Sequence, residues 1–176
     1  MFELTDLPNL DELKRLAERY GNPDIEGLQL WLTWMSANHS MLSSFEAQLM
    51  KTAGISRTQF FVLMLLKRYP EGRSIGQLAD GVTVASQTMT RMVNRMVDEG
   101  LCTRIPDPAD ARGRIVQLTD AGHALVDKAV PRNYQWVANT MAHFTEEDRR
   151  QLRHLLAKLE EAGFTAAQTR QDTRQN

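Results

Sequence analysis

The fold is decided by residues 86–118, whose sequence is SQTMTRMVNRMVDEGLCTRIPDPADARGRIVQL. In its first part, Met and Val stand at positions 89, 92, 93, 96 and 97, which is the spacing of one face of an amphipathic helix. Gly100 supplies the left-handed residue that commonly ends a helix, so a helix is predicted over about residues 86–99. The period then changes to that of two short strands, Cys102–Ile105 and Ile115–Leu118, joined by a polar, turn-rich hairpin.

A shorter helix is predicted just before this stretch, over Ile75–Gly81. Ser74 opens it, and Leu78 and Ala79 share its inward face. Two short helices joined by a tight turn form a helix-turn-helix, and a hairpin directly after them has the position of a wing. Residues 55–119 are therefore expected to form a winged helix-turn-helix domain.

The N-terminal arm, residues 1–54, is predicted as two helices. Asn9 can cap the first, and Glu12, three residues later, completes a capping box. The second is a longer amphipathic helix with a broad apolar face, and Gly54 ends it. A second capping box, Ser56-Arg57-Thr58-Gln59, then opens an apolar helix that is expected to be buried.

The C-terminal arm, residues 120–163, is also predicted to be helical. Pro131 removes a backbone donor from its long first helix and should kink that helix. The last helix is expected to end at Gly163 and carries a narrow leucine stripe, formed by Leu152, Leu155, Leu156 and Leu159. The polar residues 164–176 are expected to be a disordered tail.

Composition narrows the class of protein. The 176 residues are 42% hydrophobic and 24% charged, which is ordinary for a soluble globular protein. No stretch approaches the roughly 18 consecutive apolar residues of a membrane span, and the N-terminus lacks the features of a secretory signal, so we expect a cytoplasmic protein without membrane contact. Because the net charge is −1, any nucleic-acid-binding surface must come from local segregation of charge.

The sequence contains no recognisable catalytic or metal-binding motif. Cys102 is the single cysteine, so neither an internal disulfide nor a cysteine-based zinc site can form. We expect it to be a buried hydrophobe, with oxidant sensing as the alternative. The histidines are scattered without a pair at metal-ligand spacing, and no phosphate loop or nucleophile elbow occurs. We therefore expect no enzymatic activity and no cofactor.

The face of the 86–99 helix opposite its methionines is polar and basic. An α-helix fits the major groove of DNA, where Arg, Asn, Gln and Thr suit the base edges. The N-terminal residues of such a helix usually reach the bases, so the candidates for base or phosphate contacts are Ser86, Gln87, Thr88, Thr90 and Arg91. Asn94 and Arg95, further along, are better placed to contact the DNA backbone. A polar face that is merely solvated is the alternative for this helix taken alone.

The hairpin favours the DNA interpretation. Arg112 and Arg114 flank Gly113 at its expected tip, where long cationic side chains can enter a minor groove or pair with phosphates. Asp110 is predicted to orient Arg112 through a bidentate carboxylate pair. A winged helix that contacts protein, with DNA binding lost, is the rival class, but such a wing has no need for this pattern of arginines.

Several motifs in this region form one pattern, namely Ile55-Ser56-x-x-Gln59-Phe60-x-Val62-Leu63, Leu78-Ala79, Thr88-x-Thr90-Arg91, Arg104-x-x-Asp107-Pro108-x-Asp110-x-Arg112 and Leu118-Thr119-x-x-Gly122. The pattern resembles the MarR family of transcriptional regulators over roughly residues 55–159, and its wing segment is the most specific part. The chain departs from the family at Ala85, where such proteins commonly have Ser. Either Ser86 therefore caps the helix, or its start is less firmly held.

The resemblance implies a homodimer whose two winged domains span a pseudo-palindromic DNA operator, and it favours a repressor over an activator. A dimer is also expected because the arms carry apolar stripes that the central domain cannot cover alone. A two-fold pair suits half-sites one DNA turn apart, about 34–36 Å. The expected fold class is mainly α with a small β-hairpin wing, in which N- and C-terminal dimerisation helices flank the winged domain.

The resemblance also implies a small-molecule effector. Similar regulators often bind aromatic or phenolic acids between the dimer arm and the DNA-binding domain, in clefts lined by aromatics with a few polar anchors. The candidates here are Trp31, Trp34, Asn38 and His39 on the long N-terminal helix, with Arg73 as the cation. Our hypothesis is that such a ligand shifts the half-site spacing and releases the repressor from DNA. The alternative is that both tryptophans pack the dimer core.

Overall fold

The computed structural model describes residues 8–21, 24–108 and 110–172, without the side chains of residues 111–112 and 164–172. It divides into two compact units, Met1–Asn133 and Tyr134–Asn176. The elements in chain order are α1 (Leu10–Tyr20), α2 (Ile25–Ala53), α3 (Arg57–Arg68), β1 (Arg73–Ser74), α4 (Ile75–Val82), α5 (Ser86–Asp98), β2 (Cys102–Asp107), β3 (Asp110–Leu118), α6 (Asp120–Met141) and α7 (Glu146–Asp172).

Capping residues set the starts of several helices, as the sequence predicts. Asn9 and Glu12 form the expected capping box of α1. At α3 the Gln59 backbone N–H donates to Ser56 Oγ at 3.2 Å, and the Ser56 N–H donates back to Gln59 Oε1 at 3.0 Å. Ser74 and Gln77 form a third box at α4, which the sequence analysis did not identify. Each box supplies acceptors for backbone N–H groups that the first turn of a helix cannot pair internally.

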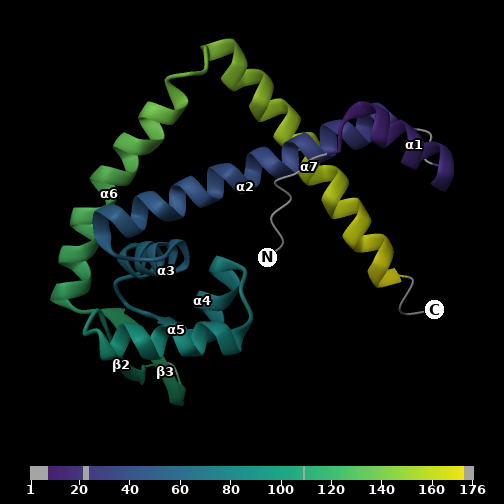
Figure 1. Ribbon diagram of the computed structural model, residues 1–176. Helices are drawn as coiled ribbons and strands as arrows, with labels where there is room; N and C mark the ends of the chain where they lie inside the picture. The colour runs from purple at the N-terminus through teal and green to yellow at the C-terminus, as the bar shows by residue number, and fades with distance from the viewer. Residues whose placement is uncertain (1–7, 22–23, 109, 173–176) are drawn as a thin grey trace. The chain divides into compact units, whose positions relative to one another are not determined.

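One hydrophobic core joins the helix-turn-helix to both arms. In the first unit α3, α4 and α5 lie together, with β2 and β3 next to α5 (Figure 1). The buried side chains come from all of these elements and include Leu63 and Leu66 of α3, Leu78 of α4, Met89, Val93 and Met96 of α5, and Val116 of β3. Leu49 of α2 and Val126 and Ala129 of α6 belong to the same core. The arms therefore help to form the interior of the winged domain.

The wing is an antiparallel sheet with strand order β1-β3-β2. The sequence analysis missed β1, because Arg73 and Ser74 are too few residues to show a strand period. It also ended the first hairpin strand too early, at Ile105, whereas β2 continues to Asp107. It began the second strand too late, at Ile115, whereas β3 begins at Asp110. Pro106 suggested a turn but lies on the edge strand β2, where the missing backbone donor is tolerated.

The tip of the hairpin differs from the prediction. The turn falls between Asp107 and Asp110, so Arg112 and Arg114 lie within β3 and not at the tip. Arg114 pairs with Pro106, whereas a register irregularity leaves residues 111–113 without partners on β2. A Cβ at Gly113 would lie 3.0 Å from the Asp107 Cβ, so a glycine permits this close approach of the two strands.

The C-terminal helices extend further than expected. The α6 helix continues through Pro131 to Met141, and the kink expected there stays a prediction. The expected end of the last helix at Gly163 is wrong, because α7 continues to Asp172 through a segment that the sequence analysis assigned to a disordered tail. A glycine inside a helix costs only about 1 kcal/mol relative to alanine, and the alanines around Gly163 favour helix. None of the helices described is long and apolar enough to cross a membrane.

Candidate nucleic-acid interface

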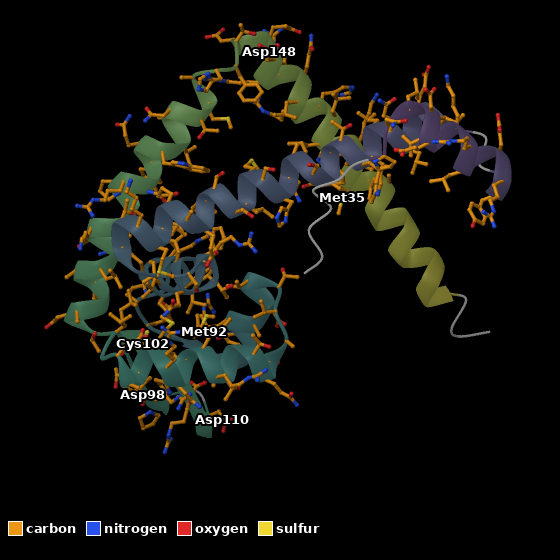
Figure 2. All side chains as sticks on the ribbon, viewed as in Figure 1. Met35, Met92, Asp98, Cys102, Asp110 and Asp148 are labelled. Carbon is orange, nitrogen blue, oxygen red and sulfur yellow. The ribbon has the colours of Figure 1, made fainter. Side chains whose placement is uncertain are left out.

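The exposed face of α5 carries most of the residues that the sequence predicts to contact DNA. Met89, Val93 and Met96 are buried, and Met92 lies between α5 and α3 (Figure 2). The polar side chains that remain exposed on this helix are Ser86, Gln87, Thr88, Arg91, Asn94, Arg95 and, at its last position, Asp98. The predicted amphipathic pattern of this helix is therefore confirmed.

The start of α5 has no side-chain cap. Ala85 is the N-cap residue, and its carbonyl accepts from the Thr88 and Met89 backbone N–H groups. Ser86 lies inside the helix, so the second of the two expected alternatives holds. The amides of the first turn are thus left without a side-chain acceptor at the end of the helix where a dipole attracts anions.

Thr90 and Arg91 differ in how accessible their side chains are to DNA. Thr90 is partly buried, and its hydroxyl donates to the Ser86 carbonyl at 2.9 Å, which makes it the least accessible of the predicted contacts. Arg91 is exposed, and no hydrogen bond or ion pair joins it to another residue in the described part of the chain. Its guanidinium is therefore available to a base edge or a phosphate.

Asn94 and Arg95, in the second half of α5, each bond to a neighbouring side chain. Arg104 on β2 donates from Nη2 to Asn94 Oδ1 at 2.5 Å, which ties the wing to α5. On the other side, Arg95 Nε donates to Glu99 Oε1 at 2.7 Å. The sequence analysis assigned neither Arg104 nor Glu99 to the site. Arg104 is exposed although strand alternation would place it on the same face as the buried Cys102, and its pairing with α5 depends on the fold.

The wing carries two exposed arginines, Arg104 and Arg114. Arg114 is exposed, and its Nη1 donates to the Gly113 carbonyl at 3.3 Å. Asp110 lies at the outer part of the hairpin (Figure 2). The side chain of Arg112 lies outside the described residues, so its pairing with Asp110 stays a prediction. Arg104, bonded to Asn94, places positive charge beside α5, and Arg114 is a second exposed cation on the wing.

The residues predicted to bind an effector do not all come together. Trp31 and Trp34 contact each other on α2, with ring centroids 5.3 Å apart, and Asn38 is partly buried on the same helix. Arg73 instead stacks its guanidinium 3.6 Å from the centroid of the Tyr69 ring and lies 4.0 Å from Glu71. Among the described residues, no ring contact, hydrogen bond or ion pair joins Arg73 to either tryptophan.

His39 faces a different cation. It lines an open groove of about 460 Å³ together with Leu42, Glu46, Met50 and Arg57. Its Nε2 lies 3.3 Å from Ser43 Oγ on the next turn. The backbone N–H of Arg57 donates to Glu46 at 3.0 Å, which fixes the start of α3 against α2. Arg57 therefore shares a groove with His39, one of the predicted effector residues, and the sequence analysis did not identify it.

Cys102 has the environment of a core residue. It is buried at the start of β2, and burial raises the pKa of its thiol to about 12. Only the thiolate reacts readily with oxidants, so this environment argues against the oxidant-sensing alternative. No group of His, Cys, Asp and Glu suited to a metal ion occurs among the residues that the structure describes.

A helix-turn-helix followed at once by a β-wing, with exposed arginines on the second helix and on the wing, defines the winged helix-turn-helix class of transcription regulators. Residues 55–113 match the model of the MarR family. Over this segment the chain therefore resembles the MarR family of winged helix-turn-helix transcriptional regulators.

Curated relatives and a solved structure agree with this assignment. The transcriptional regulator PecS of Dickeya dadantii is 30% identical over 108 residues, which are 60% of this chain and 65% of PecS. The transcriptional repressor YetL of Bacillus subtilis is 27% identical over 152 residues, which are 84% of this chain and 88% of YetL. The chain thus spans slightly less than two thirds of PecS and most of YetL.

The solved structure is that of the transcriptional regulator MosR of M. tuberculosis, which was crystallised in complex with DNA. It is 27% identical, has a TM-score of 0.60, and the match covers 77% of this chain and 96% of that chain. The predicted fold class, mainly α with a small winged sheet, is confirmed.

Proposed function

We propose that the protein is a homodimeric repressor that binds a pseudo-palindromic operator, with α5 in the major groove and the wing against the flanking backbone. The observation that carries this proposal is Arg91, exposed on α5 and without a partner in the described part of the chain, together with the exposed Arg104 and Arg114 of the wing. Arg91 suits a guanine edge or a phosphate, and the wing arginines suit the backbone. MosR, which shares the fold, was crystallised with DNA.

The α7 stripe supports a dimer. In the single chain Leu152, Leu155, Leu156 and Leu159 are 39–55% exposed. They follow the i, i+3, i+4, i+7 spacing of one helix face, which is the pattern of a helix that packs against another helix. A second copy of the chain would cover this stripe and bring two winged domains to one duplex.

The sign of regulation and the effector rest on less direct support. YetL is a repressor by name, and this chain spans most of its length. The proposed effector is an aromatic or phenolic acid that binds in the groove on α2 beside His39, with Arg57 as the carboxylate partner. An open groove with a cation in its lining suits that ligand class. Trp31 and Trp34 contact each other nearer the start of α2. The competing possibility is that these side chains pack the dimer core.

Selection of bound sequences from a random duplex pool tests DNA recognition. An inverted repeat is the expected product, and its affinity should fall steeply with salt because each arginine–phosphate contact releases a counterion. If a folded, dimeric protein recovers nothing above background, the DNA-binding proposal is wrong and a protein-contacting winged helix becomes the better explanation.

A panel of aromatic and phenolic acids tests the effector. A true effector should change tryptophan fluorescence and weaken binding of the selected operator. Arg57→Ala should abolish the response, whereas Arg73→Ala, which removes an equal charge from the Tyr69 side, should leave it intact. A response that depends on Arg73 and not on Arg57 would contradict the proposed position of the ligand.

A further inference from the structure

An acidic residue, Glu99, ends α5, the proposed recognition helix. Neither helix stability nor DNA affinity favours an acidic residue at this position. Glu99 follows the last residue of α5, and its carboxylate is 36% exposed. The C-terminus of a helix carries a partial negative charge that disfavours a carboxylate. An unpaired carboxylate beside DNA phosphates would also repel them. Glu99 therefore needs another explanation.

Glu99 holds Arg95 by one edge only. Its Oε1 accepts from Arg95 Nε at 2.7 Å, and the Arg95 side chain remains 72% exposed. The Arg95 side chain makes no other hydrogen bond or ion pair with the described residues. The two terminal nitrogens of the guanidinium are therefore left to donate outward, and the bond at Nε fixes the plane in which they lie.

Glu99 is itself anchored from the core. Gln59 is only 5% exposed, and its Nε2 donates to Glu99 Oε2 at 3.3 Å. The Oε1 of the same amide accepts from the Ser56 backbone N–H in the α3 capping box. A Glu at this position would complete the capping box equally well but would repel Glu99. Gln59 is thus the residue type that serves both partners.

We propose that Glu99 is a positioning residue for DNA binding, which holds the Arg95 guanidinium toward a backbone phosphate while the buried Gln59 amide fixes Glu99. This inference rests on the proposed function and extends it to residues that do not contact DNA. The chain of bonds also links α3 to the far half of the recognition helix. Because a flexible arginine loses rotamer entropy when it binds, an arginine held in place beforehand binds a phosphate more tightly.

The proposal is testable because the two explanations of Glu99 predict opposite changes in DNA affinity for Glu99→Ala. If Glu99 were a bystander acid near DNA, Glu99→Ala would remove a repulsion and tighten binding. If Glu99 positions Arg95, the same change weakens binding, by about three- to tenfold. Glu99→Gln keeps an oxygen that can accept from Arg95 Nε, so it should restore part of the loss. Affinity for the duplex recovered in the selection experiment is measured across a salt series.

A double-mutant cycle with Arg95→Ala separates positioning from a general structural role. In the Arg95→Ala background, Glu99→Ala should no longer weaken binding, because the residue that it positions is absent. Gln59→Glu should reproduce the loss in the presence of Arg95 and leave the Arg95→Ala protein unchanged. Unfolding temperatures of all variants are compared, and Glu99→Gln, the isosteric change, serves if Glu99→Ala lowers stability.

The outcomes are distinct. Weaker binding that requires Arg95 supports the inference. Equal or tighter binding by Glu99→Ala, or a loss of the same size in the Arg95→Ala background, overturns the inference and leaves the proposed function intact. If the wild-type protein binds no duplex, the proposed function and this inference fall together.

Discussion

At the scale of single residues, the arginines of the DNA-facing surface differ in how far they are fixed. Arg95 is held by Glu99 and Arg104 is bonded to Asn94, whereas Arg91 has no partner among the described residues. An arginine held by a neighbour suits a fixed phosphate, and a free one can adapt to a base edge. We therefore propose that Arg91 recognises a base and that the other two contact the backbone.

Arg91→Ala should weaken operator binding by about 1–3 kcal/mol and relax the base preference at one position in each half-site. Repeating the selection with the variant and comparing the recovered consensus measures both effects. A uniform loss of affinity across all sequences, with the consensus unchanged, would instead make Arg91 a phosphate contact.

Cys102 should be chemically inert in the folded protein. Because burial raises the pKa of its thiol to about 12, little thiolate is present at neutral or mildly alkaline pH. Alkylation by iodoacetamide should be slow until denaturant exposes the residue, and Cys102→Ser should bind DNA identically before and after peroxide treatment. Rapid alkylation of the native protein would contradict this assignment.

At the scale of elements, a helix or strand could be predicted from the sequence when the residues that determine it are close together in the chain. The capping boxes at Asn9 and Ser56 and the glycine at the end of α2 are local signals, and the structure confirms them. The β1 strand exists only because β3 pairs with it, and the Asn94–Arg104 bond exists only because β2 lies beside α5. Such pairings are set by the tertiary fold, so no sequence period reveals them.

The uncapped start of α5 gives a prediction about stability. Ala85→Ser should restore a side-chain acceptor for the first turn and raise the free energy of unfolding by about 0.5–2 kcal/mol. Denaturant unfolding of the variant measures the change. Ala85→Val, which offers no acceptor, is the control and should give no such gain.

At the scale of the whole molecule, the apolar surface of the single chain sets the assembly. The leucines of α7 remain substantially exposed, and so do Trp31, Met35 and Leu30 of α2. Isolated surface hydrophobics are ordinary, but a continuous stripe on a helix marks an interface. The proposed DNA recognition therefore depends on the proposed dimer.

Leu155→Glu should shift the protein from dimer toward monomer in sedimentation velocity, because it places a charge in the α7 stripe. Operator affinity should fall with it, since two half-sites are no longer bound together. Ala157→Glu adds the same charge to the exposed surface of α7 away from the stripe and should leave the dimer intact. A monomer in the wild type, or an undisturbed dimer in Leu155→Glu, would rule out this interface.

The shared core has a consequence for how such regulators can be rebuilt. Leu49 from one arm and Val126 and Ala129 from the other fill the same interior as the helix-turn-helix. Cutting the chain at the edges of the winged domain would leave holes where these side chains stood and expose the surfaces that they cover. The segment proposed to contact DNA is therefore not a portable module, and grafting it onto foreign arms would require a redesigned interior as well as new linkers.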